Sequence, residues 1–170
     1  FRRSDLAPAL IALDAYAQIA SWDGLRTQPL AALYRNDACN RGVEANLAQE
    51  ELLASVIVPD RPCHQAYEKI SRCSAGESAW ASAAVVIEAE RDRITAARVV
   101  LGGIASGPRV CERAAELLVG KSAADIESAR LANEILAAAP SAAPDNHPRT
   151  RTAATAIEHA LVRVLRGLVS

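Results

Sequence analysis

The stretch ITAARVVLGGIASGPRVCERAAELLVGK, residues 94–121, contains the transition that decides the fold. Residues 94–101 are rich in β-branched side chains and predict a strand, which Gly102-Gly103 ends. Residues 108–119 predict a helix, with Gly120 just past its end. The segments before this stretch are mostly strand-like, and the segments after it are helical. This order predicts an α+β fold.

The strands upstream of this stretch include two predicted hairpins. Residues 81–88 precede residues 94–101, with a charged turn between them. Residues 16–22 lead into Asp23-Gly24, a strong hairpin turn signal, and residues 25–30 follow it. Both hairpins indicate antiparallel pairing.

A polar connector at residues 60–65 separates two single strands and marks a domain boundary. The first of these strands covers residues 51–58 and ends at Pro59, and the second covers residues 66–70. Residues 35–46 are polar without periodicity, so they predict a surface loop.

Helices are predicted at both ends of the chain. Residues 6–14 form a short helix for which Ser4 is a candidate N-cap. Ser122 is the candidate cap of a helix that runs to about residue 139. The last helix covers residues 149–168, and its apolar stripe consists of Ile157, Leu161, Val164 and Leu168.

The composition excludes several classes of protein. A net charge of −1 argues against nucleic-acid binding, which needs an excess of basic residues. The apolar runs are too short for a transmembrane helix, and the N-terminus lacks the apolar region of a signal peptide. The chain has no methionine, which indicates a fragment, a processed chain or a truncated one.

The cysteines and histidines predict neither a metal site nor a catalytic site. No two cysteines are closely spaced, whereas zinc and iron–sulfur sites usually need such a pair. Separate reduced thiols indicate a cytoplasmic protein. The histidines do not cluster, and no catalytic triad or paired carboxylates can be argued. The cysteines are Cys39, Cys63, Cys73 and Cys111.

Residues 115–122 differ by one residue from the phosphate-binding loop G-x-x-x-x-G-K-[ST]. Gly120, Lys121 and Ser122 match, but alanine occupies the first glycine position. Such a loop needs free backbone N–H groups, whereas the residues before Gly120 are predicted helix. We interpret the match as the end of one helix and the start of the next. Residues 102–107 do not match the dinucleotide-binding pattern, and they predict a tightly packed turn, with local anion binding as the alternative.

Several segments, in order and spacing, point to one family. They are SDLAPALIALDA (4–15), EELLASVIVP (50–59), AYEKISR (66–72), residues 94–121 and the closing helix. Together they resemble the FAD-binding (medium) subunit of molybdenum hydroxylases, a family that includes xanthine dehydrogenase and bacterial carbon monoxide dehydrogenase. The resemblance covers nearly the whole chain, and its most specific part is ARVVLGGIASGPRVCERAAELLVGK.

This resemblance implies two parts and a role in electron transfer. Residues 1–59 would end the second FAD-binding subdomain, and residues 60–170 would form the flavoprotein C-terminal domain, a small antiparallel sheet with a helical bundle. The family passes electrons from iron–sulfur clusters through FAD to an acceptor. Its partners are a molybdenum-binding large subunit, which carries the molybdenum cofactor, and a small subunit with 2Fe–2S clusters. The protein places and tunes the flavin, while the chemistry belongs to the cofactor.

Three residues match positions that contact FAD in the family. Asp5 follows the family's second phosphate-binding motif, Leu53 matches a leucine beside the flavin, and Lys69 matches a lysine near the isoalloxazine ring. A cation there favours the charge that reduction places on the flavin. Without the resemblance, Asp5 reads as an acid at a helix start, Leu53 as a core residue and Lys69 as a solvated strand residue.

Departures from the family pattern leave two hypotheses open. The family's glycine-rich phosphate motifs lie upstream of Asp5, and this chain starts after both. Cys73 follows Arg72 where the family tends to have paired arginines, and residues 155–157 replace a Tyr-Arg pair. The chain is either part of an FAD-dependent oxidoreductase subunit, inactive in isolation, or a cofactor-free interaction or scaffold domain that keeps the flavoprotein C-terminal fold.

Overall fold

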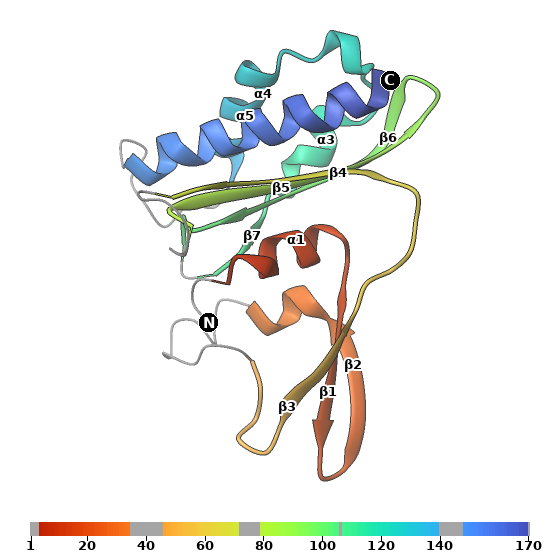
Figure 1. Cartoon of the computed structure of the whole chain (residues 1–170), viewed down its shortest axis with the longest axis vertical. Coiled ribbons are helices and arrows are strands. Elements are labelled where there is room, and N and C mark those ends of the chain that lie inside the picture. Colours follow the sequence, from red (N-terminus) through yellow and green to blue (C-terminus); the bar gives the residue numbers. More distant parts are fainter. Residues whose placement is uncertain (1–3, 35–45, 72–78, 106, 140–147, 170) are drawn as a thin grey trace.

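The computed structural model describes residues 4–34, 46–71, 79–105, 107–139 and 148–169. These residues form two antiparallel sheets, an N-terminal sheet of strands β1–β3 and a C-terminal sheet of strands β4–β7. Helices lie on both faces of the C-terminal sheet. The N-terminal sheet lies beyond the helix that covers one of these faces (Figure 1). The predicted α+β class is confirmed.

The N-terminal sheet is built on the predicted hairpin. Strand β1 (Tyr16–Ser21) turns at Asp23-Gly24 into β2 (Gly24–Pro29). Strand β3 (Leu52–Ile57) pairs with the other side of β1 and gives the order β2-β1-β3. Alternate residues of β1 are buried, whereas β2 and β3 are largely exposed. The sheet therefore packs through one face only.

The C-terminal sheet has the order β4-β5-β6-β7. Its strands are β4 (His64–Ile70), β5 (Ala81–Glu90), β6 (Arg93–Gly102) and β7 (Arg109–Val110). Strands β5 and β6 form the second predicted hairpin. Every residue of β5 from its start to Ile87 is buried, because both faces of this sheet are covered.

Helices cover the two faces of the C-terminal sheet. Helices α3 (Arg113–Leu118), α4 (Ser128–Ala138) and α5 (Pro148–Val169) lie on one face. Helix α1 (Leu6–Ala12) lies on the other and contacts the 3-10 helix η1 (Leu30–Tyr34) (Figure 1). Helix α5 is long, but neither it nor any other helix in the described part of the chain is apolar enough over sufficient length to cross a membrane.

Two predicted helix boundaries are wrong. The helix predicted over residues 108–119 begins only at Arg113, because residues 109–110 pair with β6 as strand β7. The helix predicted from Ser122 is interrupted. Ser122 does cap a 3-10 turn, η2 (Ala123–Asp125), but Ile126 is extended and packs against the core before α4 begins. Tertiary packing overrides local helix preference at both places.

The predicted last helix, which is α5, is confirmed, with Ile157, Leu161 and Val164 buried along its stripe. The predicted loop at residues 35–46 falls almost entirely outside the described residues. Residues 140–147 lie outside them as well.

Alternate residues of β5 contribute to two apolar cores. Ala83, Val85 and Ile87 face helices α3–α5 in the larger core. Ala84 and Val86 face α1, β1 and η1 in the smaller one. The smaller core therefore joins the N-terminal sheet to the C-terminal sheet, and α1 lies between them.

Candidate functional site

The structure brings two of the three predicted site residues into contact. The Nζ atom of Lys69 lies 2.5 Å from Oδ2 of Asp5, although the two residues are 64 positions apart in the chain. The other carboxylate oxygen of Asp5 accepts a hydrogen bond from the backbone N–H of Ala79 at 3.1 Å. About one third of each charged side chain is exposed, 32% for Lys69 and 33% for Asp5. The pair is therefore ordered and still accessible.

Local structure explains why these two side chains meet. Asp5 directly precedes α1, where the Ser4 hydroxyl accepts a hydrogen bond from the N–H of Ala7. This contact confirms Ser4 as a cap of the helix. Lys69 lies opposite Ser82 in the β4–β5 register. That register places it on the face of the sheet that packs against α1.

The surroundings keep the Asp5 carboxylate ionised. Burial raises its pKa, but the hydrogen bonds from Lys69 and Ala79, with the attraction of the Lys69 ammonium, lower the pKa below its usual 3.8. Burial raises the pKa of the neighbouring Tyr67 phenol, against the effect of the nearby Ser82 hydroxyl, and the Asp5 carboxylate adds to the rise. A charged pair therefore lies beside a neutral phenol.

Leu53, the third predicted site residue, lies in the other sheet. A bulge in β3 leaves Ala54 unpaired, since Gln18 faces Ser55 and the next residue of β1, Ile19, faces Leu53. The bulge thus turns Leu53 to the side of the sheet on which Ile19 is buried, and 41% of Leu53 remains exposed. No contact between Leu53 and the Asp5–Lys69 pair is found among the described residues.

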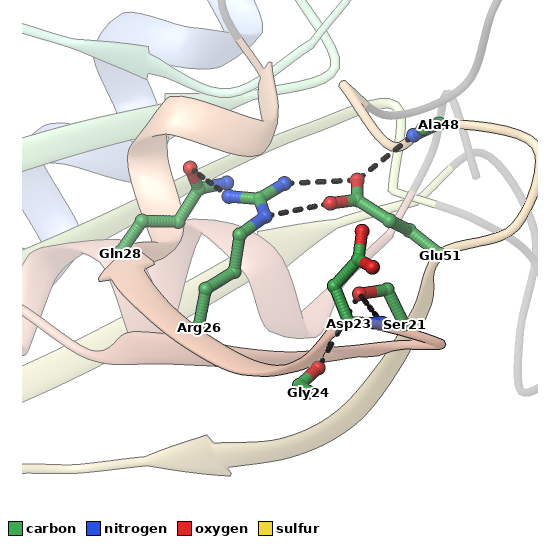
Figure 2. A network of polar contacts seen from close by, with 7 residues as sticks. All are labelled: Ser21, Asp23, Gly24, Arg26, Gln28, Ala48 and Glu51. Carbon is green, nitrogen blue, oxygen red and sulfur yellow. Dashed lines mark hydrogen bonds and ion pairs between the residues drawn. The ribbon is translucent and has the colours of Figure 1, made fainter.

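An ion pair that the sequence did not reveal lies in the N-terminal sheet, between Arg26 and Glu51 (Figure 2). The guanidinium of Arg26 donates to both carboxylate oxygens of Glu51, from Nε at 2.6 Å and from Nη2 at 2.9 Å. Its Nη1 also donates to Gln28 at 2.8 Å, and the N–H of Ala48 donates to Glu51 at 2.9 Å. The hydrogen bond from Arg26 lowers the pKa of Glu51 to about 2, with help from Ala48.

This pair was missed because its partners meet only through the sheet register. Arg26 on β2 faces Ile19 on β1, which faces Leu53 on β3. Glu51 lies just before β3, so the ion pair connects the two outer strands over the central one. The residues are 25 positions apart in the chain, and nothing in their local sequence indicates that they are partners.

The Gly-Lys-Ser stretch is held against the start of β6 by its backbone. The N–H of Gly120 donates to the carbonyl of Ile94 at 2.8 Å, and the N–H of Ile94 donates to Lys121 at 3.1 Å. The Arg93 side chain donates to the carbonyl of Gly120 at 2.7 Å. Helix α3 precedes this stretch as predicted. These backbone groups are committed within the fold, which supports the interpretation that the stretch joins two helical segments.

The turn at Gly102-Gly103 is tightly packed, as predicted. Gly103 has φ +82°, and a Cβ added there would lie 2.6 Å from the carbonyl oxygen of Trp80. Its own carbonyl accepts a hydrogen bond from Arg149, whose guanidinium lies 4.2 Å from the centre of the Trp80 ring. These contacts support the prediction of a tightly packed turn.

No metal-binding group is found within the part of the chain that the structure describes. Cys111 is buried, and burial raises the pKa of its thiol to about 12, so it is a packed and unreactive thiol. Cys63 is free and half-buried. Cys39, Cys73 and His147 lie outside the described residues.

The Asp5–Lys69 pair has the chemistry to hold one edge of a polar aromatic ring. The ammonium donates hydrogen bonds, the carboxylate accepts them, and both have free capacity beyond their mutual contact. An isoalloxazine ring carries N–H and carbonyl groups along one edge, so these residues fit the ring end of FAD. The Gly120–Ser122 stretch does not fit the phosphates of FAD, because its backbone groups are already bonded to β6.

Comparison with protein families identifies the C-terminal sheet and its helices. Residues 65–164 match the model of the CO dehydrogenase flavoprotein C-terminal domain. The match begins within β4 and ends within α5. It therefore includes Lys69 but neither Asp5 nor Leu53.

Solved structures share the fold over nearly the whole chain. Quinoline 2-oxidoreductase from Pseudomonas putida 86 aligns with a TM-score of 0.79 at 21% identity, covering 98% of this chain and 57% of that one. CO dehydrogenase from Oligotropha carboxidovorans aligns with a TM-score of 0.77 at 23% identity, covering 95% and 56%. The enzyme from Hydrogenophaga pseudoflava aligns with a TM-score of 0.75 at 22% identity, covering 95% and 59%. The chain thus spans a little over half the length of these solved chains.

Proposed function

This chain belongs to the family of CO dehydrogenase flavoprotein C-terminal domains, and we propose that it is part of the FAD-binding subunit of a molybdenum-containing hydroxylase. FAD, when bound, supplies the redox chemistry that connects iron–sulfur clusters to an electron acceptor. The proposed partners are a molybdenum-binding large subunit and an iron–sulfur small subunit, in a xanthine dehydrogenase-like complex in the cytoplasm.

The observation that carries this proposal is the Asp5–Lys69 ion pair. It joins the residue before α1 to the first strand of the matched family domain. In the proposed role, Lys69 holds a positive charge against the ring edge, and Asp5 fixes the position of the ammonium. The lowered pKa of Asp5 extends the charged state of the carboxylate further into the acid range.

We also propose that residues 1–59 form the end of an FAD-binding subdomain and residues 60–170 the C-terminal domain. Support comes from the large apolar side chains that the structure leaves exposed. All of those described, except Val119, lie between residues 6 and 58: Leu6, Tyr16, Trp22, Leu25, Leu52, Leu53, Ile57 and Val58. A surface so rich in apolar groups is typical of one that further protein covers.

FAD content is the test of this proposal. We expect the complete polypeptide that contains this sequence to purify with close to one FAD per chain, and the 170-residue chain alone to retain none and to be inactive. The physical reason is that the pyrophosphate supplies much of the polar anchoring of a dinucleotide. A complete polypeptide without flavin, even after incubation with FAD, would contradict the proposal.

A cofactor-free scaffold is the second candidate, and one observation favours it. Lys69 and Asp5 already form an ion pair without any ligand, so the pair also has a purely structural explanation. Under this alternative, the complete polypeptide would bind partner subunits without flavin. The same FAD measurement therefore separates the two candidates.

A further inference from the structure

Four charged side chains meet where the N-terminal sheet joins the rest of the molecule. Asp14 accepts a hydrogen bond from Nη2 of Arg61 at 2.5 Å on one carboxylate oxygen and contacts Nη2 of Arg98 at 2.5 Å on the other. Arg61 also reaches Glu88 with its Nη1 at 3.3 Å. These residues, called here the Asp14 cluster, are Asp14, Arg61, Glu88 and Arg98.

Two chain segments connect the N-terminal sheet to the rest of the molecule, and each contributes one member of the Asp14 cluster. Asp14 lies between α1 and β1, and Arg61 lies between β3 and β4. In Figure 1 both connections run along the same side of the molecule. Glu88 on β5 and Arg98 on β6 provide the anchor on the C-terminal sheet. The cluster therefore ties both connections to one place on that sheet.

The backbone at Asp14 turns sharply to enter β1. Asp14 has φ +55°, a left-handed conformation that aspartate tolerates better than most residues. Its N–H donates to the carbonyl of Ile11 at 3.0 Å, and the N–H of Ala15 donates to Leu10 at 3.0 Å. The carboxylate thus projects from a fixed point of the backbone.

We propose that Asp14 is a positioning residue that fixes the orientation of the N-terminal sheet relative to the C-terminal sheet. The apolar core that the two sheets share holds them together, but apolar contact is not directional. Charge-assisted hydrogen bonds to two guanidinium groups are directional. The carboxylate therefore selects one orientation among those that the core permits.

The consequence for function rests on the proposed flavin role. Leu53 belongs to the N-terminal sheet and Lys69 to the C-terminal sheet, so the orientation of the sheets sets how these residues are placed relative to each other. Loosening the Asp14 cluster should weaken the binding of any ligand that contacts both sheets.

The orientation can be measured in the 170-residue chain by residual dipolar couplings. In the wild type, we expect the amides of β1–β3 and of β4–β6 to fit one common alignment tensor. In Asp14→Asn, which removes the charge and keeps the size and the left-handed preference, we expect the common tensor to be lost. Glu134→Gln is the matched control, since it removes an ion pair with Arg130 on α4. A common tensor in Asp14→Asn, unchanged from the wild type, would overturn the proposal.

A second variant and a salt dependence extend this test. Asp14→Gly accepts φ +55° without strain, so it removes the carboxylate even if the asparagine variant folds poorly. Because the members of the cluster are between 30% and 38% exposed, high salt should also weaken the common alignment in the wild type. Preserved alignment in the glycine variant would contradict the proposal.

The flavin consequence has its own readout. In the complete polypeptide with FAD, Asp14→Asn should raise the dissociation constant of FAD by about threefold or more. An unchanged constant, with the alignment lost, would refute the link to the flavin and leave the positioning role of Asp14 supported. A polypeptide that binds no FAD would refute the proposed function alone.

Discussion

The two sheets of this molecule differ in how completely their faces are covered. The C-terminal sheet has helices on both faces, and its strand β5 is buried over consecutive residues from Ala81 to Ile87. The N-terminal sheet packs through one face only. Its outer strands expose Leu25 on β2 and Leu52 and Ile57 on β3. The C-terminal sheet is thus covered on both faces by helices of this chain, one of which, α1, lies outside the matched residues, whereas the exposed apolar side chains of the N-terminal sheet support the proposal that other protein covers it.

The largest expected difference in stability is between two leucine-to-alanine substitutions, one in each region. Leu161 is 0% exposed and Leu52 is 62% exposed. Leu161→Ala should lower the free energy of unfolding by about 2–5 kcal/mol, because it opens a cavity in the larger core. Leu52→Ala should change it by less than about 0.5 kcal/mol. Chemical denaturation of the 170-residue chain measures both.

The effect of Leu52→Ala can also be measured in the complete polypeptide. If other protein covers the N-terminal sheet there, Leu52→Ala should cost about 1 kcal/mol or more, because its apolar surface is then removed from water. Equal effects of Leu52→Ala in both proteins would show that the open face is simply surface.

A smaller effect is expected at the turn that closes the C-terminal sheet. Gly103 and Gly120 have nearly the same φ, +82° and +83°, but only Gly103 is packed against backbone. Gly120→Ala should cost about 1–2 kcal/mol for the left-handed conformation alone. Gly103→Ala should cost more, because its Cβ would meet the Trp80 carbonyl at 2.6 Å. Equal thermal stability of the two variants would contradict the tight packing of this turn.

The Asp5–Lys69 pair should appear in the acid dependence of stability. The pKa of Asp5 is lowered from 3.8 in the folded protein, so the pair stabilises the fold above the unfolded pKa. That stabilisation is lost as the pH falls through the folded pKa. Asp5→Asn should therefore destabilise the chain at neutral pH and by progressively less below about pH 4.

Denaturation of both proteins between neutral and acid pH provides the measurement. Asp23→Asn is the control, because Asp23 is an exposed hairpin residue whose carboxylate forms no hydrogen bond or ion pair within the described part of the chain. A stability difference between wild type and Asp5→Asn that does not change with pH would show that the ion pair contributes nothing.

The smallest expected effect concerns the N-terminal sheet. The pKa of Glu51 is about 2 because Arg26 donates two hydrogen bonds to it. In Arg26→Gln, NMR titration should find the Glu51 pKa raised toward its usual 4.5. The pair is exposed, so little change in stability is expected. A Glu51 pKa that stays near 2 in the variant would show that Arg26 is not its main partner.

Local signals were enough to predict most of the elements. Asp23-Gly24 predicted the first hairpin because its turn chemistry is local, and Ser122 was recognised as a cap because a cap bonds only two residues away, although it begins a 3-10 turn and not the predicted helix. Strand β7 was not predictable, since residues 109–110 become a strand only through pairing with β6. The interruption at Ile126 likewise depends on its packing in the larger core.

The candidate site depended on contacts that the local sequence does not contain. The resemblance to the family selected Asp5, Leu53 and Lys69, and the structure shows which of them meet. The Asp5–Lys69 contact follows from the docking of α1 on the C-terminal sheet. The Arg26–Glu51 pair and the Asp14 cluster also require sheet registers and chain crossings, which composition and periodicity cannot provide.

A redox titration of the flavin in the complete polypeptide, with Lys69→Ala, Lys69→Arg and the control Lys121→Ala, tests directly whether the Lys69 charge acts on FAD. A cation near the ring stabilises the charge that appears on reduction. We therefore expect Lys69→Ala to lower the reduction potential by about 30 mV, which corresponds to roughly 1.4 kcal/mol for a two-electron couple. Lys69→Arg should lower it less, and Lys121→Ala should leave it unchanged. An unchanged potential in Lys69→Ala, with FAD fully bound, would contradict the proposed role of Lys69 at the flavin and leave it as the structural partner of Asp5.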